Sequence, residues 1–244
     1  MLRALVLDVD GVVAETEDFH RLAYNALFRE LGLPIEWSRE DYVLQLHQVG
    51  GLKIQELESQ GLIPKGSAER VYGRKRRIYL DLLGEAAQSG MLPPRPGIVR
   101  LVRECRDAGL SLAVASTSAP EAVQRALEGA FGEDPRRMFS PIIDSMQVKA
   151  LKPDPEAYRK ACEGLGIPPA GAIAIEDTRH GLASALGAGL ACLVTPSEFT
   201  VGQDFSGACA IVPDLDRGPR GPVTVADLRG WVDGQDGRAR PDRR

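Results

Sequence analysis

The chain has 244 residues, of which 43% are hydrophobic and 26% are charged, and its formal net charge is −4. These values are typical of a globular protein with a sizeable core. The slightly acidic balance offers no basic surface for nucleic acid or for an anionic membrane. No apolar run approaches the roughly 20 residues of a membrane-spanning helix. We therefore expect no nucleic-acid partner and no membrane association.

Four cysteines, at positions 105, 162, 192 and 209, show no Cys-x-x-Cys spacing. The chain starts with a strand-like apolar run, whereas a secretory signal has a basic segment followed by an apolar one. These features predict reduced thiols in a cytoplasmic protein. We also expect a monomer.

The first predicted strand covers residues 4–7, a short apolar run followed at once by Asp8, Asp10 and Gly11. Such a run fits a parallel strand that is buried on both faces. The two carboxylates then lie beyond its carboxyl end, where open α/β sheets bind ligands. Carboxylates this close repel each other unless a cation lies between them, which favours a hard metal ion such as Mg²⁺. A simple Asp-Gly turn is the alternative, whereas a calcium loop would need a terminal Glu that is missing.

Residues 15–90 carry helical patterns and no good strand. Apolar residues recur at helical spacing over residues 17–31. Ser38, followed three residues later by Asp41, predicts the start of a second helix that Gly50-Gly51 ends. Further helices are predicted over residues 53–59 and 67–87.

After Pro93-Pro94, strands alternate with helices. Strands are predicted over residues 111–116, 141–145, 172–176, 190–194 and 210–212. Helices are predicted over residues 98–107, from Pro120, from Pro155 with Asp154 as N-cap, and over residues 181–187. This alternation predicts an α/β fold with a Rossmann-like, doubly wound parallel sheet. We expect residues 1–14 and 91–232 to form the catalytic core, residues 15–90 an inserted all-helical cap, and residues 233–244 a disordered tail.

Polar residues follow three further segments of the predicted sheet. Ser116 and Thr117 end the second strand, Glu176 and Asp177 end another, and Lys152 precedes a proline-stiffened turn. Taken singly, these residues have ordinary explanations as helix caps or a surface lysine. Parallel topology, however, brings them to the same sheet edge as the two aspartates of the first strand. The combination supplies metal ligands, a nucleophilic carboxylate and phosphate donors, which predicts phosphoryl transfer through an aspartyl-phosphate.

In order and spacing, these four motifs resemble those of the haloacid dehalogenase-like hydrolase superfamily. The segments Lys152-Pro-Asp-Pro-Glu-Ala-Tyr and Ile-Glu176-Asp-Thr-Arg-His-Gly resemble its branch of β-phosphoglucomutase and small sugar phosphatases. Residues 14–20, AETEDFH, resemble the CbbY-like proteins, which dephosphorylate sugar bisphosphates such as xylulose-1,5-bisphosphate. The resemblance spans residue 2 to about residue 195 and implies a Rossmann-like core with a helical cap after its first strand.

The resemblance also implies a role for each motif residue. Asp8 corresponds to the nucleophile and a metal ligand. Asp10 corresponds to the general acid and base, whose backbone carbonyl also contacts Mg²⁺. Asp177 corresponds to a further metal ligand, with Glu176 beside it. The dehalogenases of the family lack the second aspartate, so Asp10 argues against dehalogenation. The implied phosphate binders are Ser116, Thr117 and Lys152.

Substrate choice is expected to reside in the cap, because a cap closes over the substrate. The polar residues considered there are Glu17, His20, Tyr42, Lys53, Lys75 and Arg95. Each of them is alternatively a solvated helix residue, and Lys75 lies in the basic run RKRR. The CbbY-like proteins carry Gly-Gly-Lys where this chain has Gly50-Gly-Leu-Lys53, so the extra residue affects where that lysine points.

The sequence thus favours a Mg²⁺-dependent phosphatase, a phosphoric monoester hydrolase whose partner is a small phosphorylated sugar. An intramolecular sugar phosphomutase of the β-phosphoglucomutase type uses the same aspartate pair and is the alternative. A non-catalytic phosphate-sensing protein on this fold is a third possibility, which the retention of Asp8 and Asp10 disfavours.

Overall fold

The computed structural model describes residues 1–46, 50–132 and 134–234. These residues form two compact units. The first comprises Met1–Glu15 and the chain from Leu92 onward, and the second is Thr16–Met91. Of the predicted tail, Asp233 is the last residue of a helix, and residues 235–244 lie outside the described residues.

The first unit is built on a six-stranded sheet, in which every strand pair is parallel. The order across the sheet is β3-β2-β1-β4-β5-β6, so β1 lies between β2 and β4. This order confirms the predicted Rossmann-like, doubly wound sheet. The strands are β1 (Ala4–Leu7), β2 (Ser111–Ala115), β3 (Ile142–Ile143), β4 (Ala172–Glu176), β5 (Ala191–Val194) and β6 (Ala210–Ile211).

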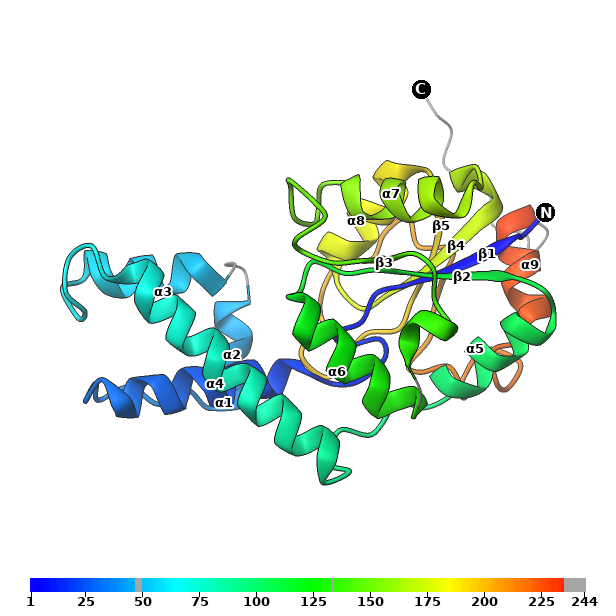
Figure 1. Cartoon of the computed structure of the whole chain (residues 1–244). Coiled ribbons are helices and arrows are strands. Elements are labelled where there is room, and N and C mark those ends of the chain that lie inside the picture. The colour runs from blue at the N-terminus through cyan, green and yellow to red at the C-terminus, as the bar shows by residue number, and fades with distance from the viewer. Residues whose placement is uncertain (47–49, 133, 235–244) are drawn as a thin grey trace. The chain divides into compact units, whose positions relative to one another are not determined.

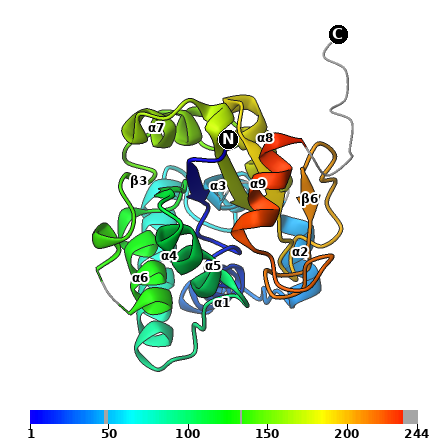
Figure 2. The ribbon, with the colours of Figure 1, turned by 90° about the vertical axis from the view of Figure 1, so that its right-hand side faces the viewer.

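Helices cover both faces of this sheet (Figure 1). One face packs against α5 (Ile98–Asp107), α6 (Pro120–Phe131) and α9 (Val225–Asp233). The other packs against α7 (Glu156–Leu165) and α8 (Arg179–Ala188). Figure 2 shows α9 and α5 on the side of the sheet away from α7. Two short 3₁₀ helices, Pro135–Arg137 and Pro169–Gly171, complete the unit.

Side-chain size differs between the two faces of the sheet. On β1, Leu5 and Leu7 join the core under α5, α6 and α9, whereas Ala4 and Val6 face the core under α7 and α8. Strand residues point alternately to opposite faces, so the run reads as continuously apolar although each face has its own composition. The face toward α7 and α8 is lined by small residues, including Ala113, Ala115, Ala172 and Ala174.

Every regular element among the described residues of the second unit is a helix. It contains α1 (Glu17–Glu30), α2 (Arg39–Gln45), α3 (Gly50–Ser59) and α4 (Ala68–Gln88). Tyr24 and Phe28 of α1 are buried and pack against the ring of Trp37. Asn25, also buried, donates a hydrogen bond to the Trp37 carbonyl and accepts one from its N–H, both at 2.9 Å. This exchange satisfies the buried amide and fixes the segment that leads into α2.

The observed starts of three helices, α2, α3 and α7, can be compared with the starts predicted from the sequence. Ser38 and Asp41 form the predicted capping box of α2. The predicted start of α3 was wrong, because the helix begins at Gly50 and includes both glycines in its first turn, although it ends at Ser59 as predicted. At α7 the N-cap is Pro155 instead of Asp154, whose carboxylate accepts a hydrogen bond from the N–H of Glu156 at 2.9 Å. Asp154 therefore acts in the turn before the helix.

The helix α9 was not predicted, although its start carries a capping box like that of α2. Thr224 accepts a hydrogen bond from the N–H of Asp227, and the Asp227 carboxylate accepts one from the N–H of Thr224. The pattern Thr-x-x-Asp is the signal that would have revealed this helix.

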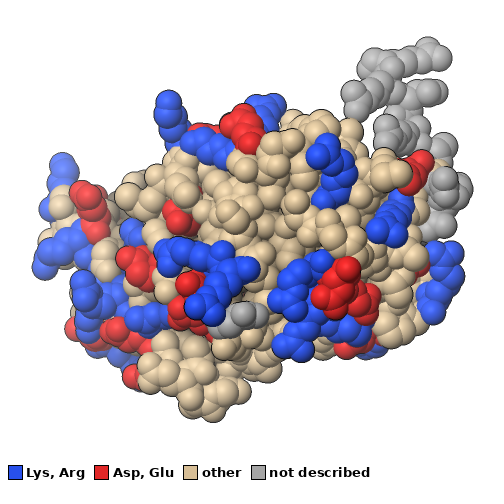
Figure 3. All heavy atoms as spheres, turned by 45° about the vertical axis from the view of Figure 1, so that its right-hand side comes forward, with Lys and Arg blue, Asp and Glu red and all other residues tan. Residues whose placement is uncertain are grey.

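Surface charge agrees with the balanced composition. Figure 3 shows acidic and basic side chains interspersed over the face in view. Among the described residues, no helix is long and apolar enough to cross a lipid bilayer.

The core under α5 sets much of the stability of the first unit. Leu101 of α5 is completely buried, so we expect Leu101→Ala to lower the free energy of unfolding by about 2–5 kcal/mol, because a cavity replaces the side chain. Leu186 of α8 is 38% exposed, and Leu186→Ala is the matched control with a much smaller loss. Urea denaturation of both variants measures the difference. Equal losses would contradict this description of the core.

Candidate active site

The strand register brings the predicted motifs to one edge of the sheet. Leu7, the last residue of β1, pairs with Val114 of β2 on one side and with Ile175 of β4 on the other. The residues that follow these strands therefore lie next to one another. The N–H of Asp8 continues the ladder by donating to the Ile175 carbonyl at 3.1 Å. Ser116 is held in the same way, through a hydrogen bond from its N–H to the Ile143 carbonyl at 3.0 Å.

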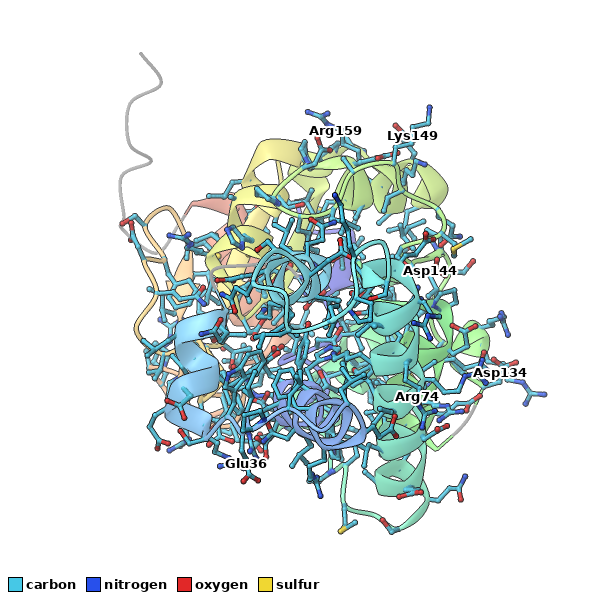
Figure 4. All side chains as sticks on the ribbon, turned by 90° about the vertical axis from the view of Figure 1, so that its left-hand side faces the viewer. Glu36, Arg74, Asp134, Asp144, Lys149 and Arg159 are labelled. Carbon is cyan, nitrogen blue, oxygen red and sulfur yellow. The ribbon has the colours of Figure 1, made fainter. Side chains whose placement is uncertain are left out.

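Lys152 joins the acidic ends of two strands. Its ammonium group lies 2.6 Å from Asp8 Oδ1 and 2.6 Å from Glu176 Oε1. The Lys152 side chain is only 8% exposed, unlike Lys149 and Arg159, which extend outward from the molecule (Figure 4). The Tyr158 hydroxyl donates to the same Glu176 oxygen at 2.6 Å, and the Lys152 ammonium lies 5.0 Å from the centre of the Tyr158 ring. The interpretation of Lys152 as a surface lysine is therefore wrong.

Burial and neighbouring charges change the proton affinities of this group. Burial raises the pKa of Asp8 to about 8, against the opposing effect of the Lys152 ammonium. The nearby carboxylates of Glu176 and Asp10 raise it further. Burial lowers the pKa of Lys152, but the Asp8 and Glu176 carboxylates outweigh burial and raise it above its ordinary value. The site thus has more negative charge than the single ammonium balances.

Three of the buried carboxylates are close enough to share one ion. Asp8, Glu176 and Asp177 each offer an oxygen, and these oxygens lie within 4.8 Å of one another. When all three carboxylates are ionised, they and the one ammonium leave two negative charges, which a single divalent cation would neutralise. Carboxylate oxygens are the ligands that hard cations such as Mg²⁺ prefer. The residues present therefore fit a divalent hard cation.

Two glycines allow these acids to approach the backbone. A Cβ at Gly11 would overlap the carboxylate of Asp177, and Gly11 also has a φ of +72°. A Cβ at Gly181, in the first turn of α8, would overlap the carboxylate of Glu176. Both sites thus require glycine because a carboxylate occupies the space of its missing side chain.

The remaining motif residues lie at the start of α6. The Ser118 hydroxyl donates to Asp10 Oδ2, and the Ser118 N–H donates to Ser116 Oγ at 3.0 Å. Ser118 thus holds the Asp10 carboxylate, and the N-cap of α6 is Ala119. Thr117 is half-buried between the two serines.

Five of the six residues considered for the substrate lie together in the helical unit. The Tyr42 hydroxyl donates to Glu17 Oε1 at 2.8 Å. The Lys75 ammonium lies 2.6 Å from His20 Nδ1, and the His20 ring stacks on the Tyr79 ring with centroids 3.8 Å apart.

Lys53 belongs to the same group. Its ammonium lies 5.7 Å from the centre of the Tyr42 ring, and its side chain is buried despite the extra residue before it. Burial lowers the pKa of Lys53 to about 8, while Glu17 acts in the opposite direction. Burial and the cations of Lys75 and Lys53 hold the pKa of His20 well below its ordinary value. We use the name helical-unit cluster for the five residues Glu17, His20, Tyr42, Lys53 and Lys75.

Arg95, the sixth residue considered for substrate binding, lies in the first unit. Its guanidinium donates hydrogen bonds to the backbone carbonyls of Gly11, Thr195, Pro196 and Pro213. It therefore contacts backbone beyond three strands of the sheet, and it is not part of the helical-unit cluster.

Sequence reasoning missed the roles of Tyr158 and Ser118. Tyr158 lies six residues after Lys152, and nothing in the local sequence reveals the hydrogen bond from its hydroxyl to Glu176. Ser118 lies in a Ser-Thr-Ser run in which the sequence does not distinguish the hydroxyl that caps a helix from one that holds a carboxylate.

The sequence of this chain matches that of a known protein family. The model of the haloacid dehalogenase-like hydrolases matches residues 2–189. The chain belongs to this family. The protein CbbY of Rhodobacter capsulatus is 38% identical over 217 residues, which cover 88% of this chain and 94% of that relative. The predicted resemblance to the family and to its CbbY-like branch is confirmed.

Solved structures of the family agree with this assignment. CbbY from Rhodobacter sphaeroides in complex with phosphate is 35% identical, with a TM-score of 0.76 over 88% of this chain and 95% of that one. A variant of the same protein in complex with xylulose-1,5-bisphosphate is 33% identical, with a TM-score of 0.78 over 93% and 99% of the two chains. A β-phosphoglucomutase from Clostridium difficile, at 19% identity and a TM-score of 0.74, shares the fold.

The contact between Gly11 and Asp177 gives a sharp test of this family site. We expect Gly11→Ala to displace the Asp177 carboxylate and so to weaken the binding of a divalent cation, measured as a smaller rise in melting temperature when Mg²⁺ is added. Gly109→Ala is the matched control, because Gly109 has a similar φ of +76° but nothing within 4 Å of an added Cβ. Both substitutions cost roughly 1–2 kcal/mol of folding free energy, because alanine disfavours the left-handed backbone conformation of these positions. Equal protection by Mg²⁺ in both would contradict the close approach.

Proposed function

We propose that this protein is a Mg²⁺-dependent phosphatase of small phosphorylated sugars that acts through an aspartyl-phosphate on Asp8. The observation that carries the proposal is the buried contact between the Asp8 carboxylate and the Lys152 ammonium, beside Glu176 and Asp177. We assign to these neighbouring groups the roles of nucleophile, phosphate-binding cation and cation ligands, which phosphoryl transfer requires together.

Asp8 is the proposed nucleophile. One carboxylate oxygen attacks phosphorus, the bond from phosphorus to the sugar oxygen breaks, and the phosphoryl group is transferred to Asp8. Lys152 Nζ has three N–H donors, of which Asp8 and Glu176 accept two. The third is available to a phosphoryl oxygen, so the lysine can bind phosphate without releasing the acids.

Asp10 is the proposed general acid and base. Its carboxyl group gives a proton to the leaving sugar oxygen, and its carboxylate then takes a proton from the water that hydrolyses the aspartyl-phosphate. The Ser118 hydroxyl, which donates to Asp10 Oδ2, fixes the carboxyl group for both steps. Ser116 Oγ accepts from the Ser118 N–H, so its own hydrogen can be donated to a phosphoryl oxygen.

The metal ion would be held by Asp8, Asp177 and the backbone carbonyl of Asp10, with Glu176 nearby. When bound, Mg²⁺ supplies charge that offsets the repulsion between the phosphoryl group and the carboxylates. Glu176 already accepts hydrogen bonds from Lys152 and Tyr158. We therefore assign Glu176 mainly to the orientation of Lys152.

A sugar bisphosphate is the substrate class that we favour. The helical-unit cluster holds two buried ammonium groups, those of Lys53 and Lys75. Buried cations are stabilised by a strong anion, and we propose that this cluster binds the second phosphate of the substrate. The CbbY relative in complex with xylulose-1,5-bisphosphate supports this substrate class. We further propose that the protein is cytoplasmic, since all four cysteines are free thiols, and that it is a monomer.

Replacement of the nucleophile tests the covalent mechanism. We expect Asp8→Asn to abolish phosphate release from xylulose-1,5-bisphosphate, because an amide cannot form the acyl-phosphate. The fold should persist, since asparagine has the same shape and Glu176 still pairs with Lys152. Phosphate release with and without Mg²⁺, together with circular dichroism, provides the measurement. Normal turnover by the pure variant would refute the mechanism. If the wild-type chain formed an isomeric sugar phosphate and released no phosphate, it would be a mutase.

Removal of one buried cation tests the substrate class. We expect Lys75→Met to raise KM for the bisphosphate about tenfold or more, because a hydrogen bond to a charged group contributes about 1.5–3 kcal/mol. KM for p-nitrophenyl phosphate should hardly change, since that substrate has no second phosphate. Arg74→Met is the matched control on the preceding residue, whose guanidinium is half-exposed (Figure 4) and pairs with Glu30. Equal effects on both substrates would place the second phosphate elsewhere.

A further inference from the structure

Arg95 makes an unusual set of contacts for a residue outside the strands. One terminal nitrogen donates to the Gly11 carbonyl and, at 2.9 Å, to the Thr195 carbonyl. The other donates to the Pro196 carbonyl at 2.9 Å, to the Pro213 carbonyl at 3.2 Å and to Thr195 Oγ1 at 3.2 Å. These acceptors follow β1, β5 and β6, so a single planar group connects three strand ends.

Two of these acceptors lead directly to the acidic site. Gly11 follows Asp10, and its Cα lies against the Asp177 carboxylate. Thr195 donates a hydrogen bond from its N–H to the Glu176 carbonyl at 2.8 Å. Arg95 thus spans the loop that carries Asp10 and the segment bound to the end of β4. The backbone N–H of Arg95 also donates to the Val13 carbonyl at 2.8 Å, which fixes the far end of the same loop.

We propose that Arg95 is a positioning residue, which sets the loop of Asp10 and Gly11 at the correct distance from Asp177 and Glu176. The inference rests on the proposed function, because that function assigns Asp10 to proton transfer and its carbonyl to the metal ion. The guanidinium suits this task because its donors diverge in a fixed plane, whereas a lysine ammonium is a point charge on a flexible chain. The peptide after Asp10 is therefore held from outside the site by a side chain that does not touch the substrate.

The test compares Arg95→Met and Arg95→Lys with the wild-type chain. We expect both variants to lower kcat for p-nitrophenyl phosphate, by up to about 10²-fold for a displaced catalytic group, with little change in KM. Both should also need more Mg²⁺ for half-maximal protection against thermal unfolding. Arg95→Lys keeps the positive charge, so a kcat that stays low in this variant shows that geometry is required in addition to charge.

Arg100 provides a matched control in α5. Its guanidinium also donates to two backbone carbonyls, of Leu215 and Val223, and to the carboxylates of Glu104 and Asp216. None of these acceptors adjoins the acidic site. Arg100→Met should lower the melting temperature while kcat and the Mg²⁺ response stay at wild-type values.

The outcomes separate this inference from the proposed function. Wild-type kcat and Mg²⁺ response in either Arg95 variant would overturn it, as would an equal loss of kcat in Arg100→Met. Failure of both Arg95 variants to fold would make the residue structural and would overturn it as well. If the wild-type chain releases no phosphate, the proposed function fails, whereas the Mg²⁺-dependent melting of the variants still decides whether Arg95 positions the acids.

Discussion

The Lys152 ammonium is buried between the carboxylates of Asp8 and Glu176, and the acidic site depends on this charge. Removing an ammonium group from water costs several kcal/mol unless it is paired and hydrogen-bonded. Here it is compensated only when β1, β4 and the loop before α7 are all in place, because its partners come from the first two and the lysine comes from the third. Assembly of the nucleophile is thus tied to assembly of the sheet.

Much of this site could be predicted from local signals. Asp8, Ser116 and Glu176 each follow a short apolar run, and the parallel register then places them side by side without further information. Gly11 marks a turn that only glycine accommodates when Asp177 lies against it. The alternation of strands and helices likewise predicted the sheet, and the order around β1 confirmed it.

The features that could not be predicted depend on partners far away in the sequence. Arg95 reads as a substrate-binding cation, yet its acceptors are backbone carbonyls near residues 11, 195 and 213, and carbonyl positions have no sequence signature. Tyr158 reads as one more core residue of α7, although its hydroxyl contacts Glu176. The start of α3 was misplaced because the intrinsic preference against glycine, about 1 kcal/mol, is too weak to exclude it from the first turn of a helix.

The unequal faces of the sheet bear on how this enzyme can be altered. Alanines line the face toward α7 and α8, where added methyl groups would push apart the helices that deliver Tyr158 and Gly181 to Glu176. Leucine and isoleucine on the opposite face can be exchanged for other large residues at nearly constant volume. A library of variants built for new properties will retain more folded members if its diversity is directed to the face under α5, α6 and α9 and to the helical unit. The face lined by alanines is best left unchanged, because larger side chains there would also shift the groups that contact the Glu176 carboxylate.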